Sequence, residues 1–142
     1  EYERSILDDL DWLGLVPDEP ATRVFRSGAT PYRQSDNLAR YAAALRALEQ
    51  EGLAYACVCS RKDLQQSDEG RYPGTCRDRH VDPASTTMRR VRLNAVDGAE
   101  HFVDLRLGPQ LQDPFEQCGD FPLRDRNGNY TYQFCVTVDD FD

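Results

Sequence analysis

The stretch from Cys57 to Cys76 opens as Cys57-Val-Cys59 and closes as Tyr72-Pro-Gly-Thr-Cys76. Two thiols separated by one residue can face a common ion, because side chains of an extended chain alternate in direction. A Pro-Gly turn brings in a third thiol, Cys76. Zinc takes four ligands in protein structural sites, and thiolates are among those it prefers. The stretch therefore predicts a zinc site around which a strand end and a long loop fold back on each other.

The fourth zinc ligand has two candidates. His80 stands in a Cys76-x-x-x-His80 arrangement, which ordinary ligand spacing selects first. Tyr72 also lies within reach, but a phenol with a pKa of about 10 becomes a ligand only if the metal lowers that pKa. A disulfide among the three cysteines, or three ordinary buried thiols, are the alternatives to a metal site. Spacing favours zinc, with His80 ahead of Tyr72.

Length and composition indicate a single globular domain. The chain has 142 residues, a mass of 16.2 kDa and a mean hydropathy of −0.70. It has no apolar run approaching the roughly 20 residues of a membrane helix, and its acidic start lacks the apolar core of a signal peptide. An odd count of five cysteines favours a reducing compartment. The absence of an initiator Met predicts a piece of a longer chain.

The net charge of −8 argues against non-specific binding of nucleic acid over the whole surface. Arginines nevertheless gather in and after the cysteine loop. These are Arg71, Arg77, Arg79, Arg89, Arg90 and Arg92. They form either a local basic face that meets phosphates or a solvated rim, and the sequence leaves both interpretations open.

The first half of the chain has an α/β pattern. Apolar residues recur at helical spacing over Tyr2–Leu13, and Gly14 follows as a helix C-cap. Ser35 is the expected N-cap of a second helix, which ends at Gly52. A buried strand is expected over residues 53–58. Ser60 and Asp63 then form a weak capping box for a short helix.

The second half predicts hairpins. An Asp97-Gly98 turn separates two alternating segments, one ending at Leu93 and one running from Val103 to Leu107. Asn127-Gly128 is the clearest hairpin signal, and it joins residues 121–126 to a strand over 130–138. His101 is expected on an exposed strand. Cys118 and Cys135 are expected as buried small residues.

Tyr132 has two interpretations on that last strand. Periodicity favours a core aromatic. A buried phenol needs a hydrogen-bond partner, however, and one near a strand end could offer its hydroxyl to a ligand. The sequence shows no nucleophile constellation and no Gly-rich phosphate loop, and Asp139 and Asp140 are expected as capping or loop residues. No catalytic residue is therefore predicted in this segment.

Several motifs together resemble class I glutamyl-tRNA synthetases, and most closely their truncated paralogues, the glutamyl-Q tRNA(Asp) synthetases. The resemblance covers nearly the whole chain. The segments that carry it are 6–14 (ILDDLDWLG), 33–35 (RQS) with Tyr41, 52–55 (GLAY), 57–61 (CVCSR), 72–77 (YPGTCR), 120–124 (DFPLR) and 132–140 (YQFCVTVDD).

The resemblance implies an α/β fold, a partial Rossmann-type class I aminoacyl-tRNA synthetase catalytic core. Residues 1–142 would be part of one catalytic domain, with a zinc-binding insertion at 57–80. The implied activity is ATP-dependent activation of glutamate, with magnesium-bound ATP, and transfer of the glutamyl group to queuosine in the anticodon of tRNA(Asp). The enzyme is expected to be a cytoplasmic monomer without membrane association.

The resemblance also assigns residues. It implies that Cys57, Cys59, Tyr72 and Cys76 are the zinc ligands, in place of His80, and that Tyr132 binds glutamate. The family's ATP-binding signature and its lysine-containing loop have no match here, so the segment alone is expected to be inactive. Two alternatives remain: a glutamyl-tRNA synthetase fragment that charges tRNA(Glu), and a non-catalytic zinc-braced RNA-binding module.

Overall fold

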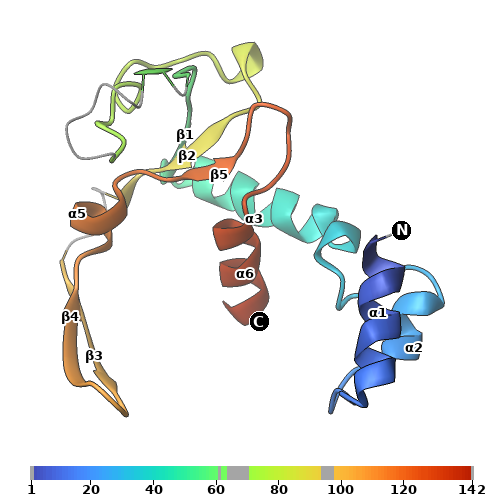
Figure 1. The fold of residues 1–142 in the computed structure, drawn as a ribbon. Coiled ribbons are helices and arrows are strands. Elements are labelled where there is room, and N and C mark those ends of the chain that lie inside the picture. The colour runs from blue at the N-terminus through green and yellow to red at the C-terminus, as the bar shows by residue number, and fades with distance from the viewer. Residues whose placement is uncertain (1, 61, 64–70, 94–97, 142) are drawn as a thin grey trace. The chain divides into compact units, whose positions relative to one another are not determined.

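The computed structural model describes residues 2–60, 62–63, 71–93 and 98–141 (Figure 1). These residues divide into two compact units, Glu1–Arg40 and Tyr41–Asp142.

The first unit is built from short helices that charged side chains tie together. It contains α1 (Tyr2–Leu13), α2 (Thr22–Arg26) and the 3-10 helix η1 (Gln34–Asp36). Arg26 on α2 forms ion pairs with Asp8 and Asp11 of α1, both at 2.8 Å. Gly14 follows α1 with a positive φ of 69°, which glycine adopts readily. The helix predicted over Tyr2–Leu13 is confirmed with the same bounds.

The second unit mixes helices with short strands. Helix α3 (Leu38–Gln50) leads into it. The elements that follow are β1 (Ala54–Ala56), η2 (Pro83–Ser85), β2 (Arg89–Val91), β3 (Glu100–Asp104), β4 (Gly108–Gln112), α5 (Pro114–Cys118), β5 (Pro122–Arg124) and α6 (Tyr132–Phe141). The second helix and the strand within 53–58 are thus confirmed. The helix begins at Leu38, because Ser35 lies inside η1 and does not cap α3.

The strands form two antiparallel sheets. One has the order β1-β2-β5 and pairs Tyr55 with Arg90, and the other is the β3-β4 hairpin. The described residues contain one parallel contact, an isolated bridge between Tyr72 and Gly119. A mixture of helix and sheet is therefore present. The parallel sheet that a Rossmann-type core implies is not found among the described residues.

The main apolar core of the second unit lies between α3, the three-stranded sheet and α6. We call it the aliphatic-aromatic core, and its buried residues are Tyr41, Leu45, Ala54, Leu123, Phe134 and Cys135. Tyr41 and Tyr130 meet edge to face with ring centroids 5.7 Å apart. The Tyr41 hydroxyl also donates to the Asp139 carboxylate at 3.0 Å, which satisfies the buried phenol.

The hairpin predicted around Asp97-Gly98 is wrong, because the segments on its two sides do not pair with each other. Strand β3 pairs with β4, and their turn lies at residues 105–107, so Leu105 and Leu107 are turn and not strand residues. Asp97 itself lies outside the described residues. His101 is an exposed residue of β3, as expected. Cys135 is buried as expected, but Cys118 is exposed, so that prediction is wrong.

The strand predicted over 130–138 is also wrong: after a single bridge between Arg124 and Tyr130, the chain forms helix α6. Phe134 and Val138 are four residues apart, so they lie on one face of a helix as well as on one face of a strand. The backbone N–H of Cys135 donates to the Thr131 carbonyl at 3.0 Å, an i to i−4 hydrogen bond at the start of the helix. Contact of that face with the aliphatic-aromatic core overrides the strand propensity of this valine- and aromatic-rich segment.

None of the helices in the described part of the chain is both long enough and apolar enough to cross a bilayer.

Candidate functional site

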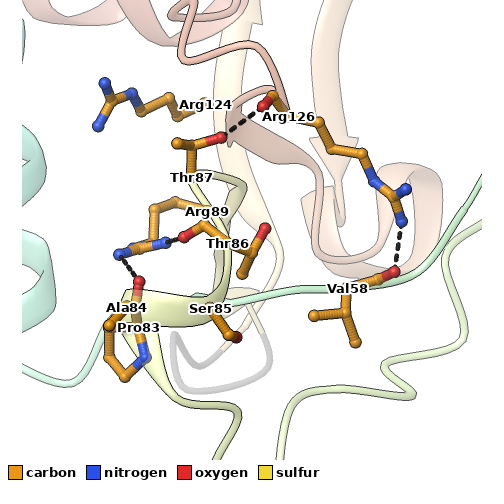
Figure 2. Close-up of a pocket in the computed structure, with 9 residues that line it drawn as sticks. All are labelled: Val58, Pro83, Ala84, Ser85, Thr86, Thr87, Arg89, Arg124 and Arg126. Carbon is orange, nitrogen blue, oxygen red and sulfur yellow. Dashed lines mark hydrogen bonds between the residues drawn. The ribbon is translucent and has the colours of Figure 1, made fainter.

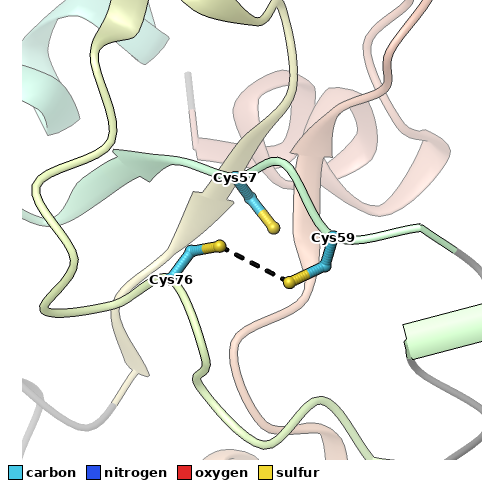
Figure 3. Close-up of side chains that lie close together, drawn as sticks. All are labelled: Cys57, Cys59 and Cys76. Atoms are coloured by element: carbon cyan, nitrogen blue, oxygen red, sulfur yellow. Dashed lines mark hydrogen bonds between the residues drawn. The ribbon is translucent and has the colours of Figure 1, made fainter.

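Three buried cysteines converge beside the sheet (Figure 3). Cys57 and Cys59 follow β1, and Cys76 lies at the end of the Pro-Gly turn. Their sulfur atoms all lie within 4.8 Å of one another, and Cys59 Sγ is 3.4 Å from Cys76 Sγ. A tetrahedral zinc with Zn–S bonds of about 2.3 Å holds its sulfurs roughly 3.8 Å apart. The three thiols are therefore spaced for one shared ion.

Tyr72 completes a four-membered group, which we call the thiol-phenol cluster. Its hydroxyl lies 3.5 Å from Cys57 Sγ and 3.6 Å from Cys59 Sγ. The backbone N–H of Cys76 donates to this phenol oxygen at 2.8 Å. Burial raises the pKa of Tyr72, so the phenol keeps its proton until a metal ion displaces it.

Arg90 suits an ionised Tyr72. The guanidinium lies 3.8 Å from the centroid of the Tyr72 ring, and Arg90 is only 2% exposed. Its Nε is buried without a hydrogen-bond partner among the described residues. A buried cation on a neutral ring is poorly compensated, whereas a phenolate bound to a metal would offset its charge. The cluster and its surroundings thus fit a cation bound by three thiolates and one phenolate.

His80 is not brought into this cluster. It is exposed, it adopts a positive φ of 48°, and the group of potential ligands that meets at the cysteines does not include it. Tyr72, and not His80, thus lies beside the three thiols. That these four residues are zinc ligands is what the resemblance implies and stays a prediction.

The thiols differ in acidity. Burial raises the pKa of Cys59 to about 11. Burial also acts on Cys76, but hydrogen bonds from the Val58 backbone and from Cys59 outweigh it and lower the Cys76 pKa. Of these two thiols, Cys76 therefore ionises more readily than Cys59.

Asp120 anchors the cluster to the rest of the unit and is completely buried. One carboxylate oxygen accepts from the Tyr55 hydroxyl and from Arg77 Nε, both at 2.7 Å, and the other accepts from the Leu93 N–H at 3.0 Å. The Asp120 carbonyl accepts from Arg90 at 2.6 Å. A buried carboxylate is tolerated only with such a full set of donors. Sequence reasoning missed this role, because the partners of Asp120 lie far away along the chain.

Most arginines of the cysteine loop have internal partners. Besides Arg77 and Arg90, Arg71 pairs with Glu116 at 3.0 Å and Arg92 with Asp78 at 3.1 Å. Arg89 forms an ion pair with Glu49 and also donates to backbone carbonyls. These five arginines brace the loop, whereas Arg79, the remaining member of the set, is exposed.

Tyr132 is the first residue of α6 and is 70% exposed. It is therefore not a core aromatic, which corrects the prediction from periodicity, and most of the residue is exposed to solvent. Asp139, on the same helix, accepts from Tyr41 and so has a structural role.

The sequence matches, over residues 1–142, the family described as tRNA synthetases class I (E and Q), catalytic domain. The chain belongs to this family of aminoacyl-tRNA synthetases, which are ligases. More particularly, it is 39% identical over 154 aligned residues to the glutamyl-Q tRNA(Asp) synthetase of Nitratidesulfovibrio vulgaris, covering 99% of this chain and 47% of that protein. It is 42% identical over 118 residues to that of Bordetella bronchiseptica, covering 77% of this chain and 36% of the relative. The chain thus spans less than half the length of these relatives.

Solved structures show the same fold. A glutamate tRNA ligase from Elizabethkingia meningosepticum, crystallised with its amino acid, matches with a TM-score of 0.70 and 21% identity, over 98% of this chain and 31% of that one. The glutamate-tRNA synthetase of Elizabethkingia anophelis matches with a TM-score of 0.70 and 20% identity, over 98% of this chain and 32% of that one. At this identity the likeness supports the class I synthetase fold alone.

Proposed function

We propose that this chain is the middle part of a glutamyl-Q tRNA(Asp) synthetase. The whole enzyme would activate glutamate with magnesium-bound ATP and transfer the glutamyl group to queuosine in the anticodon of tRNA(Asp), acting as a cytoplasmic monomer. The observation that carries this proposal is 39% identity to such an enzyme across 99% of the chain. The thiol-phenol cluster supports it, because the resemblance described above implies the same four residues as ligands.

Zinc would bind at Cys57, Cys59, Tyr72 and Cys76 within the insertion at 57–80. Four protein ligands leave no position for substrate, so the role of zinc would be structural. The metal would hold the end of β1 and the loop before Cys76 in one geometry. The chemistry of adenylate formation would belong to parts of the enzyme outside this chain.

Tyr132 would bind the substrate glutamate through its exposed hydroxyl. A neutral hydrogen bond contributes about 0.5–1.5 kcal/mol, and one to a charged group about 1.5–3 kcal/mol. In the complete enzyme, we expect Tyr132→Phe to lower kcat/KM for glutamate in ATP–pyrophosphate exchange by roughly tenfold or more. The thermal midpoint and the affinity for ATP should stay near wild type, since the ring is kept. Unchanged glutamate kinetics would show that Tyr132 does not contact the amino acid.

The acceptor decides between the proposal and ordinary glutamyl-tRNA synthetase, which is the second candidate because the matched family covers class I synthetases for E and Q in general. The complete enzyme should be given labelled glutamate with three RNAs: tRNA(Asp) with queuosine, tRNA(Asp) without it, and tRNA(Glu). Labelling that requires queuosine supports the proposal, and labelling of tRNA(Glu) supports the alternative. RNA binding without ATP–pyrophosphate exchange would favour the non-catalytic module.

A further inference from the structure

A cavity of about 620 Å³ opens on the second unit, next to Val58 of the cysteine loop (Figure 2). Val58, the segment 83–87 and three arginines line it: Arg89, Arg124 and Arg126. No carboxylate is among the described residues that line it, although the chain carries a net charge of −8. The described lining of this cavity is therefore positively charged, whereas the chain as a whole is negatively charged.

The segment 83–87 forms a braced wall. Asp82 accepts from the Ala84 N–H at 2.9 Å, and Ser85 donates back to the Asp82 carbonyl at 2.7 Å. Thr86 donates to the Cys57 carbonyl at 3.2 Å, and Thr87 to the Arg126 carbonyl at 2.6 Å. Hydrogen bonds to both sides of the cavity therefore fix its shape.

The three arginines differ in how much of their charge is compensated. The ion pair with Glu49 neutralises Arg89, and backbone carbonyls occupy its other donors. Arg124 donates Nε to the Gly128 carbonyl, and Arg126 donates one Nη to the Val58 carbonyl. In the described part of the chain, neither Arg124 nor Arg126 forms an ion pair. A guanidinium has five N–H donors, so both retain donors and a full charge.

Asp63, whose carboxylate interacts with the charge of Arg126, is already engaged. Hydrogen bonds from the Ser60 hydroxyl and backbone lower the pKa of Asp63, and the charge of Arg126 adds to this effect. Asp63 accepts from Ser60 at 2.6 and 2.7 Å and caps the turn that begins there. Its negative charge offsets part of the charge of Arg126, but no hydrogen bond joins these two described residues.

We propose that Arg124 and Arg126 hold phosphate groups of an RNA backbone that enters this cavity. Guanidinium groups pair with phosphate oxygens through parallel N–H bonds, which suits a row of phosphates. The cavity is far larger than one phosphate ion needs, and its braced polar wall suits a chain of charged groups. This inference rests on the proposed function, in which the partner is a tRNA. It places the RNA contact at Arg124 and Arg126, not at the internally paired arginines of the cysteine loop.

The test is the salt dependence of tRNA(Asp) binding to the intact protein carrying Arg124→Gln and Arg126→Gln. Glutamine removes the charge but keeps an N–H donor for the Gly128 and Val58 carbonyls. Each lost phosphate contact should reduce the slope of log K against log salt by about 1, and so by about 2 for the double variant. Arg106→Gln is the matched control, because Arg106 is exposed in the β3-β4 turn and lies outside the cavity. It should leave the slope unchanged.

The outcomes separate the two proposals. An unchanged slope in a double variant that melts like wild type overturns the cavity inference and leaves the proposed function intact. Failure of the wild-type protein to bind tRNA overturns both. If the double variant melts at a lower temperature than wild type, the two single variants are measured. The inference then stands only if a single variant that melts like wild type has a smaller slope of log K against log salt. Inorganic phosphate is the second probe: if the variants lose phosphate binding but keep the tRNA slope, the cavity is a small-anion site and not an RNA contact.

Discussion

The second unit contains two buried clusters with different chemistry. The aliphatic-aromatic core packs Leu45, Leu123 and Phe134 between helices and sheet. The thiol-phenol cluster, with Met88 beside it, buries three thiols and a phenol within a loop. Burying an aliphatic or aromatic side chain contributes about 1.5–3 kcal/mol, so the first cluster is stable without further help. The second buries polar groups whose hydrogen bonds run among its own members.

This difference explains where the arginines lie. Around the aliphatic-aromatic core the described polar contacts are few, and the Tyr41–Asp139 hydrogen bond is the chief example. Around the thiol-phenol cluster, Arg77 and Arg90 converge on Asp120, and Arg90 also covers the Tyr72 ring. Positive side chains next to a group of ionisable sulfurs favour their anionic, metal-binding forms. The comparison predicts that metal removal affects one cluster and spares the other.

The largest effect is expected from Cys59→Ser. Loss of a ligand should remove most of the zinc, and because ligation energy is also folding energy, stability should fall by about 3–5 kcal/mol. That corresponds to a melting temperature roughly 10–20 °C lower. Zinc content by elemental analysis and thermal unfolding check this. Wild-type zinc content in the variant would mean that the cluster is an ordinary buried thiol group.

Two cysteines outside the cluster serve as controls for Cys59→Ser. Cys118→Ser, at an exposed position, should change stability by less than about 0.5 kcal/mol. Cys135→Ser puts a hydroxyl in the aliphatic-aromatic core and should cost about 1–3 kcal/mol with full zinc content. Loss of zinc from the Cys135 variant would break the distinction between the two clusters.

An intermediate effect is expected from Asp120→Asn. The change leaves Arg77 without its ionic partner in a mostly buried position, at a cost of about 3 kcal/mol. Chemical denaturation measures this loss. Glu116→Gln is the control, because it breaks the exposed Arg71–Glu116 pair and should cost less than about 1 kcal/mol. Equal losses of unfolding free energy in the two variants would show that Asp120 does not anchor the loop.

The smallest effect is expected from His80→Ala. His80 is exposed and lies apart from the thiol-phenol cluster, so zinc content and melting temperature should match wild type. Cobalt substitution offers a second check, since the absorption spectrum of the bound cobalt should not change. Loss of metal in this variant would show that His80 is a ligand, as spacing alone predicts.

Local patterns predicted much of this molecule. The first helix, the strand after Gly52 and the meeting of the three cysteines follow from periodicity, turn residues and thiol spacing. Helix α6 was missed because Phe134 and Val138 satisfy both helical and strand spacing, and only contact with the core decides between them. The role of Asp120 was missed because its partners Tyr55 and Arg77 lie 65 and 43 residues away in the chain. Such distant pairings leave no mark on local sequence.

Those same distances bear on synthesis of the protein at the ribosome. The chain emerges from its N-terminus, so the cysteine loop leaves the exit tunnel before Asp120, which is needed to hold Tyr55, Arg77 and Arg90. Through that interval the thiols can meet a metal ion, but Arg77 and Arg90 lack the hydrogen bonds to Asp120 that hold them in the folded unit. We therefore expect nascent chains that end before Asp120 to lose zinc to chelators faster than chains that include β5.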